Sequence, residues 1–353
     1  MAINDANPPA GGLRGLLDTL WRIHARNESA VLGLVVATEG STYQKRGAMV
    51  LLDGQGLRHG VISGGCLEPA LEDAAREVHA AGRAARVEFD TRSDEDLLFG
   101  SGIGCRGRLQ LLLLPLPPQA PLARALYAGL DQGRDLHLAF DIGDADVGAG
   151  VARFVADAES SPIAEWNGEG RAGNASAAAS LHFDIAMPPR LLLLGAGPET
   201  APLATFARRL GWFVDVVEHR GRWSAFAQRA SIDRLIDLPP EAAIATLAQE
   251  LYDALLVMSH NYTIDLAWLR FGAASSAGYI GLLGPAARRD ALLAEIDAGA
   301  RESLSPRLHA PVGLDLGGHG GEAVALAVAA QLQQHFSMKK NVVPELLAAR
   351  IDA

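Results

Sequence analysis

The spacing of apolar residues predicts two helices and several short strands in the first third of the chain. Residues 13–25 carry leucine and isoleucine at helical spacing, and residues 67–81 repeat that spacing with charged positions on the other face. Short β-like runs lie at residues 30–37, 48–52, 58–62, 86–89 and 108–114. We therefore expect an α/β domain in the N-terminal part of the chain.

From about residue 190 the pattern changes to apolar runs that do not alternate with polar residues. These runs lie at residues 191–194, 212–217, 254–258, 279–283 and 312–316, and helical stretches separate them. Strands of this kind are typical of a parallel sheet that helices cover on both faces. The sequence predicts a Rossmann-like, doubly wound parallel sheet between about residues 189 and 335.

The chain has 353 residues, of which 49% are hydrophobic and 20% charged, and this length suggests two domains. We place the first domain at residues 1–185 and the second at residues 186–353. Residues 160–180 are rich in alanine, glycine, serine and asparagine, which favours a variable linker near residues 156–185. The expected fold class is α/β in both domains.

Charge and cysteine content narrow the class of protein. The net charge of −10 argues against general nucleic-acid binding, which needs a basic surface. The densest apolar run, residues 109–116, is too short to span a bilayer, and the first residues lack a signal-peptide pattern. Two cysteines cannot form a disulfide framework and fit a reducing compartment. We expect a cytoplasmic protein that binds neither membranes nor nucleic acid.

A glycine loop opens the second domain. Gly195 and Gly197 stand in a G-x-G pattern between a strand and a helix, and Glu218 ends the next strand. In a dinucleotide-binding fold the helix start takes phosphate and the acid holds a ribose hydroxyl. The acid favours NAD or another nucleotide over NADP, although Arg220 and Arg222 lie near it. The alternative is a tight turn that binds nothing.

Two further residues are expected at the same edge of the parallel sheet. His260 follows the strand that should flank the first strand at the topological switch point, which places it near the Gly195 loop. Asp315 ends the last predicted strand, and the glycine-rich residues 317–321 follow it. That segment either closes over a ligand or only leads into the final helix.

Both cysteines stand in glycine-rich loops of the first domain. Cys66 follows Gly64 and Gly65 at the start of a predicted helix, where partial positive charge favours a thiolate. Cys105 lies in a second glycine loop, beside Arg106. Each is either a small buried hydrophobe or a ligand for a soft metal or sulfur. Residues 40–47 form a third polar loop suited to an anion, with Ser41, Thr42 and Arg46, or a solvated connection.

Together these motifs resemble the XdhC/CoxI family of accessory proteins for molybdenum hydroxylases. The family's G-S-[T/A]-P-R-x-x-G, G-G-G-C-x-E and G-x-G-C-G-G loops are matched at residues 40–47, 63–68 and 102–107. Its G-A-G-H-x-A-x-P-L, M-T-H-D, Y-I-G-L-L-G and P-x-G-L-D-x-G elements are matched at residues 195–203, 258–261, 279–284 and 311–317. The resemblance covers nearly the whole chain except residues 115–188. Several side chains depart from the family's pattern, including Pro198 in place of histidine and Asn261 in place of aspartate.

The resemblance implies a chaperone that binds molybdenum cofactor, the pterin-based molybdopterin. Such proteins protect the cofactor, let a cysteine desulfurase-type sulfurase install its terminal sulfido ligand, and deliver it to an apo molybdenum hydroxylase such as xanthine dehydrogenase. Cys66 becomes a candidate molybdenum contact, and the second domain would hold the phosphate or nucleotide end of the cofactor. The expected cofactor-binding residues are Ser41, Thr42, Arg46, Gly64, Gly65, Cys66, Cys105, Gly195, Gly197, Glu218, His260 and Asp315.

Two other functions remain open. The second domain fits an NAD-dependent oxidoreductase with His260 as proton donor, and Cys66 fits a sulfur-transfer enzyme that carries a persulfide. We expect the non-catalytic chaperone, without assigning catalytic residues, and a homodimer through the apolar final helix at residues 322–332.

Overall fold

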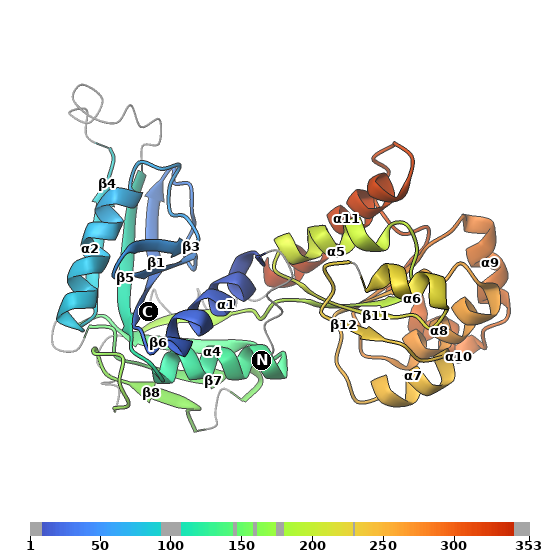
Figure 1. The fold of residues 1–353 in the computed structure, drawn as a ribbon, viewed down its shortest axis with the longest axis horizontal. Helices are drawn as coiled ribbons and strands as arrows, with labels where there is room; N and C mark the ends of the chain where they lie inside the picture. The colour runs from blue at the N-terminus through green and yellow to red at the C-terminus, as the bar shows by residue number, and fades with distance from the viewer. Residues whose placement is uncertain are drawn as a thin grey trace. The chain divides into compact units, whose positions relative to one another are not determined.

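A computed structural model describes residues 9–92, 107–143, 147–157, 161–173, 180–228 and 230–341. The chain divides into two compact units, Gly12–Met187 and Pro188–Ala353, and the described residues before Gly12 group with the second unit. Figure 1 shows the fold of each unit.

The first unit contains two antiparallel sheets and three described helices. A five-stranded sheet has the order β3-β2-β1-β5-β4, and a four-stranded sheet has the order β8-β7-β6-β9. The strands are β1 (Ala30–Gly40), β2 (Met49–Asp53), β3 (Gly56–His59), β4 (Ala85–Asp90), β5 (Gly107–Leu116), β6 (Leu136–Asp141), β7 (Gly150–Phe154), β8 (Ala164–Trp166) and β9 (Ser180–Ile185). The helices are α1 (Gly12–Ala25), α2 (Glu68–Ala81) and α4 (Pro121–Gln132), and a 3-10 turn spans Val155–Asp157.

Helix α2 covers one face of the five-stranded sheet. Its Leu71, Ala75 and Val78 pack against alternate residues of β1, β2 and β5. These strand residues lie on one face of the sheet, because successive side chains of a strand point to opposite faces. Pro69 stands in the first turn, where no N–H is needed, and Gly82 ends the helix in the left-handed conformation. Figure 1 shows α1 on the other side of this sheet, where Leu16, Leu17 and Leu20 are buried.

The second unit is the predicted doubly wound fold. Its six parallel strands have the order β12-β11-β10-β13-β14-β15. This order is that of a Rossmann sheet, with the switch point between β10 and β13. The strands are β10 (Arg190–Leu194), β11 (Phe213–Val217), β12 (Arg234–Ile236), β13 (Ala254–Val257), β14 (Tyr279–Leu282) and β15 (Leu308–His309). The expected fold class, α/β with a Rossmann-like second part, is confirmed.

Helices cover both faces of the parallel sheet. Apolar residues of α5 and α11 pack on one face, and residues of α7 and α8 pack on the other. The helices are α5 (Thr200–Arg209), α6 (Gly221–Ala227), α7 (Pro240–Leu247), α8 (Tyr262–Ala274), α9 (Ala286–Ala294), α10 (Ala298–Leu304) and α11 (Gly321–Asn341). The strands of this sheet are therefore buried on both sides, which explains their unbroken apolar sequence.

The prediction of a last strand at residues 312–316 is wrong. The sixth strand is β15, and the chain then leaves the sheet, because Gly313 has φ +103° and Leu314 donates its N–H to Ala327 O of α11 at 3.1 Å. Gln331 of α11 accepts the Gly313 N–H at 2.9 Å. These bonds replace the ladder that a strand would need.

The expected linker near residues 156–185 also differs from the structure. Residues 164–166 and 180–185 are strands β8 and β9 of the four-stranded sheet. Their apolar side chains Trp166, Phe183 and Ile185 are buried. Small residues are abundant between these two short strands, so the sequence pattern did not reveal them. The partners of β9 also lie far away in the sequence.

Candidate functional site

The turn that carries Cys66 is organised by one carboxylate. Glu68, the first residue of α2, accepts hydrogen bonds from the N–H groups of Ile62 and Ser63, at 3.2 and 2.9 Å, and from the Ser63 hydroxyl. The Ser63 oxygen in turn accepts the N–H groups of Gly65 and Leu67. Burial alone would raise the pKa of Glu68, but the hydrogen bonds from Ser63 and the neighbouring backbone lower it on balance.

The two glycines of this turn face open space. A Cβ atom built at Gly64 or Gly65 would meet no other atom within 4 Å, and Gly65 has φ +110°. Glycine is therefore required at position 65 by backbone conformation. At position 64 the backbone is exposed, so that a ligand can approach the peptide groups closely.

The polar loop at residues 40–47 lies beside this turn. Gln44 donates its side-chain N–H to Val61 O at 3.0 Å, and Thr42 donates its hydroxyl to Gln44 O at 2.7 Å. Gly107, at the start of β5, approaches so closely that a Cβ there would lie 2.4 Å from Ser41 O. Thr91 donates its hydroxyl to Gly107 O at 2.8 Å and so ties the end of β4 to the same point.

These loops enclose a shallow pocket that contains a half-buried thiol. Its lining residues are Ser41, Thr42, Tyr43, Ile62, Ser63, Gly64, Cys66, Leu67, Phe89, Thr91, Gly107 and Leu109. The structure thus brings together the 40–47 loop and the Cys66 turn, two of the three first-domain loops named in the sequence analysis. The third loop carries Cys105, which lies outside the described residues; its described end, Gly107, borders the pocket.

Sequence reasoning overlooked part of this pocket. Phe89 and Thr91 line the pocket because β4 pairs with β5 beside Gly107. No local sequence motif predicts this contact. The organising role of Glu68 has no capping-box signal in the sequence, because Ser63 stands too far before Glu68 and the N-cap residue is Leu67.

Arg46 is not among the residues that line this pocket. Its Nη2 donates to His182 O at 2.9 Å, and its guanidinium lies 4.7 Å from the centre of the Phe183 ring. The arginine therefore joins the polar loop to β9 of the four-stranded sheet. Arg46 lies outside the Cys66 pocket, and its role in cofactor binding stays a prediction.

In the second unit, the backbone N–H groups of the glycine loop before α5 donate to acceptors within the protein. Gly195 donates its N–H to Val217 O, Ala196 to the Glu218 carboxylate and Gly197 to the Thr200 hydroxyl, each at 2.9 Å. Pro198 has no N–H to offer. A dinucleotide pyrophosphate is held by free backbone donors at this point of the fold, and this loop presents none from residues 195–198.

Glu218 is likewise engaged within the protein. It is buried, and its two oxygens accept hydrogen bonds from Ala196 and from the backbone and guanidinium of Arg220. Burial would raise the pKa of Glu218, but Arg220 and the two backbone bonds lower it on balance. Arg220 also donates to Ser259 O at 2.7 Å. Glu218 and Arg220 fit a turn held by internal hydrogen bonds better than a site for the ribose of NAD.

His260 lies at the switch point, as the sequence predicts. Its Nε2 is 3.2 Å from Glu199 Oε1, and a Cβ at Gly197 would lie 3.1 Å from the same nitrogen. The residue has φ +56°, a conformation that costs free energy for a side chain other than glycine. The hydrogen bond to Glu199 raises the pKa of His260, against the opposing effect of burial.

Asp315 lies on the exposed segment between β15 and α11. The glycine-rich residues after it lead directly into α11, whose first residue, Gly321, packs against Pro198: a Cβ there would lie 2.9 Å from the Pro198 carbonyl. The segment thus abuts the glycine loop through backbone contact, which supports its interpretation as the lead into the final helix.

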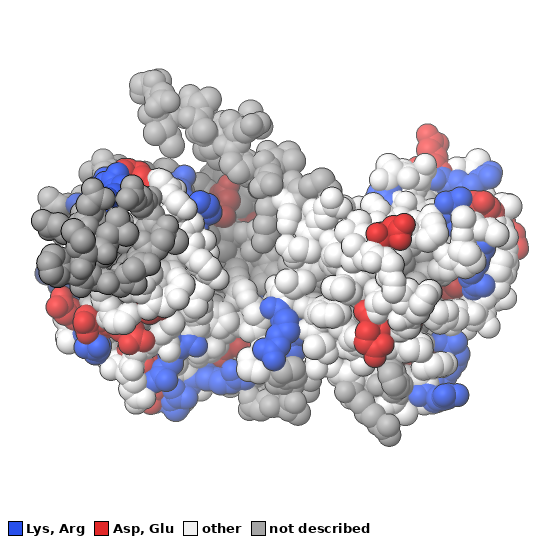
Figure 2. Space-filling model, turned by 90° about the horizontal axis from the view of Figure 1, so that it is seen from above, with Lys and Arg blue, Asp and Glu red and all other residues white. Residues whose placement is uncertain are grey.

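Two further properties of the described residues bear on the site. Among them, no helix is long and apolar enough to cross a membrane. They also hold no cluster of three histidine, cysteine or acidic side chains arranged to bind a metal ion. On the face shown in Figure 2, acidic and basic side chains are interspersed in each unit.

Comparison with known families identifies the class of protein. Residues 23–90 match the family model described as the XdhC and CoxI family, and residues 191–332 match the model described as the XdhC Rossmann domain. This chain belongs to the XdhC/CoxI family, as its motifs suggest.

Relatives cover nearly all of the chain. A probable xanthine dehydrogenase subunit of Bacillus subtilis (strain 168) is 29% identical and covers 92% of this chain and 97% of its own length. The molybdenum cofactor insertion chaperone PaoD of Escherichia coli (strain K12) is 22% identical, over 86% of this chain and 83% of its own. A crystal structure described as a xanthine dehydrogenase from Bacillus halodurans is 28% identical, with a TM-score of 0.74 over 95% of this chain and 98% of that one.

Proposed function

We propose that this chain is an accessory protein that binds molybdenum cofactor, supports its sulfuration and delivers it to a xanthine dehydrogenase-type molybdenum hydroxylase. The observation that carries the proposal is the pocket at Cys66, where an open glycine turn, several hydroxyl-bearing side chains and a half-buried thiol meet. Two relatives support the same role by their names. One is a molybdenum cofactor insertion chaperone, and the other is a probable xanthine dehydrogenase subunit.

The residues of this pocket fit one end of such a cargo. Cysteine sulfur is a ligand for soft, sulfur-rich metal centres, so Cys66 is suited to contact the molybdenum end or to relay sulfur to it. The Ser41 and Thr42 side chains and the exposed peptide groups at Gly64 supply polar contacts. Because the pocket is shallow, it can hold a cargo that must also be released.

The first test is anaerobic retention of isolated molybdenum cofactor, measured as molybdenum and pterin that co-elute with the protein on a sizing column. Wild type should retain the cofactor, and Cys66→Ala should lose most of it if the thiol contacts the metal. Retention by both would leave the carrier role intact and limit Cys66 to sulfur relay or structure. Retention by neither would overturn the carrier role.

A matched pair of glycine variants separates binding from folding. Gly64 and Gly221 both have open space where a Cβ would lie, and neither has a positive φ. Gly64→Asp should reduce cofactor retention because it places a negative charge at the pocket, whereas Gly221→Asp at the start of α6 should not. Equal retention by the two variants would contradict a cofactor site at the Cys66 turn.

A sulfur-transfer role makes a different prediction at the same residue. A persulfide would add about 32 Da, one sulfur atom, to the peptide that contains Cys66 after incubation with a cysteine desulfurase-type sulfurase and cysteine. We propose such a sulfurase and an apo molybdenum hydroxylase as partners.

We also propose a homodimer through α11, where Leu326 is exposed, and sedimentation of the Leu326→Glu variant tests it.

A further inference from the structure

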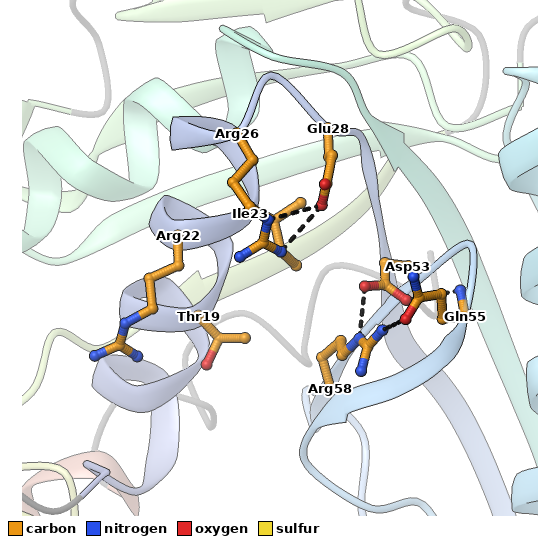
Figure 3. A pocket seen from close by; sticks show the side chains of 8 residues that line it. All are labelled: Thr19, Arg22, Ile23, Arg26, Glu28, Asp53, Gln55 and Arg58. Carbon is orange, nitrogen blue, oxygen red and sulfur yellow. Dashed lines mark hydrogen bonds and ion pairs between the residues drawn. The ribbon is translucent and has the colours of Figure 1, made fainter.

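The first unit contains a second, larger cavity on the sheet face opposite α2. It has a volume of about 450 Å³ and is lined by residues of α1, of the turn after it and of the β2–β3 hairpin. Figure 3 shows these residues: Thr19, Arg22, Ile23, Arg26, Glu28, Asp53, Gln55 and Arg58. The cavity is separate from the Cys66 pocket and shares no lining residue with it.

The lining is basic, although the whole chain carries a net charge of −10. Three arginines and two carboxylates, Glu28 and Asp53, line the cavity, and Ile23 is the one aliphatic side chain among the eight residues. Such a lining is unsuited to an apolar ligand and attracts an anion. A volume in this range is typical of small-molecule sites, which span about 300–1,000 Å³.

The two carboxylates lower the net positive charge of the lining but use only part of the N–H donors of their arginines. Arg58 donates Nε–H to Asp53 and Nη2–H to Gln55, and its side chain is 36% exposed while that of Asp53 is 9% exposed. The guanidinium is therefore the group that the hairpin presents to a ligand. Hydrogen bonds from Arg58 and from the backbone, against the effect of burial, keep the pKa of Asp53 low.

The second pair is weak and easily exchanged. Arg26 bonds Glu28 through Nε and Nη2, both at 3.0 Å, and both side chains are more than half exposed. Exposed pairs of this kind contribute little to stability. An anion with several oxygens can therefore replace Glu28 as the partner of Arg26 without disturbing the core.

We propose that this cavity, called here the α1–hairpin cavity, binds a small phosphate-bearing anion between Arg26 and Arg58, with Arg22 adding positive charge. Guanidinium groups on two elements match the geometry of phosphate oxygens, which accept paired N–H donors. The site does not depend on the proposed carrier function, and its test uses no molybdenum cofactor.

The test is calorimetric titration of the full chain with inorganic pyrophosphate at low ionic strength. Wild type should bind at one saturable site, and the double variant Arg26→Gln/Arg58→Gln should bind at least about tenfold more weakly, or about 1.4 kcal/mol. Arg76→Gln is the matched control, since Arg76 forms an exposed pair with Asp73 on α2, away from the cavity. Thermal unfolding of all variants verifies that each is folded.

Several results would overturn the proposal. One is wild type without saturable binding, and another is a double variant that binds as tightly as Arg76→Gln. Binding of an acidic peptide but not of pyrophosphate, lost in the double variant, would instead assign the cavity to an acidic segment of a partner protein. Titration with adenosine diphosphate distinguishes the sources of phosphate: tighter binding than pyrophosphate supports a nucleotide, and equal or weaker binding supports a free phosphate compound.

Discussion

The turns before α2 and before α5 contain similar glycines but differ in what their backbones face. In the turn at residues 63–67, Gly64 and Gly65 border open space beside a thiol. In the turn at residues 195–199, the backbone of Ser259 touches Gly195, and Glu218 and Thr200 occupy the amide donors. A glycine pattern therefore identifies a place where some group can approach the backbone closely. At Gly195 that group is the protein itself, and at Gly64, where the protein leaves open space, we propose a ligand.

The same difference appears in how a carboxylate is used. Glu68 holds the first turn through Ser63 and leaves the outer side of Gly64 open. Glu218 bonds the second turn at Ala196 and is itself bridged by Arg220. The first arrangement leaves a pocket beside the turn, and the second holds the turn by hydrogen bonds within the protein.

The largest expected effect comes from replacing a glycine in each turn. Gly195→Ala should destabilise the protein by about 3 kcal/mol or more, because its Cβ would lie 2.4 Å from Ser259 Cα at φ +110°. Gly64→Ala should change stability by less than about 0.5 kcal/mol. Urea unfolding of the two variants measures the difference, and equal costs would remove the contrast between the turns.

A smaller effect is expected from Glu68→Gln, which weakens the hydrogen bonds from Ser63 and Ile62. We expect a loss of about 1 to 2 kcal/mol near neutral pH. Since the pKa of Glu68 is lowered in the fold, its contribution is present above the unfolded pKa of about 4.3 and is lost as pH falls through the folded pKa. Urea unfolding at about pH 7 and about pH 3 should show the gap between wild type and variant closing in acid.

Glu77→Gln provides the control for this measurement, because Glu77 is an exposed residue of the same helix. Its effect should be small at both pH values. A Glu68→Gln penalty that persists undiminished in acid would mean that the carboxylate charge does not organise the turn.

Individual residues indicate how much of the structure could be predicted from the sequence. The parallel, doubly wound sheet and the position of His260 beside Gly197 followed from apolar runs and from the regular topology of such sheets. Periodicity and topology carry this information because buried parallel strands have few alternatives.

The remaining features depend on contacts between distant segments. Arg46 lies in a polar loop with Thr42, yet it reaches β9, which no motif in the loop indicates. Phe89 and Thr91 join the Cys66 pocket through strand pairing. The error at residues 312–316 has the same origin, since Gln331 of α11 takes the backbone N–H that a strand would use.

A smaller and more local effect is expected for the pair of His260 and Glu199 at the edge of the parallel sheet. Because the bond to Glu199 raises the pKa of His260, Glu199→Gln should lower that pKa toward about 6.5. The pair stabilises the fold fully below the unfolded pKa and less as pH rises through the folded pKa, so the variant should lose more stability at about pH 6 than at about pH 8.5. Titration of the His260 ring by NMR measures the shift, and Glu241→Gln, an exposed residue of α7, is the control. A wild-type pKa at or below the ordinary value would refute the pairing.

The smallest expected effect is the response to NAD, where we predict no stabilisation. A ligand at 100 times its Kd raises the free energy of unfolding by about 2.7 kcal/mol, which thermal unfolding detects readily. The backbone donors of Gly195, Ala196 and Gly197 are all satisfied within the protein, and both oxygens of Glu218 already accept hydrogen bonds. To bind NAD the turn would have to break these bonds, so the unfolding temperature should not move at millimolar NAD. A saturable shift that Gly197→Asp abolishes would show that the second turn opens, and would restore the oxidoreductase as the function of this unit.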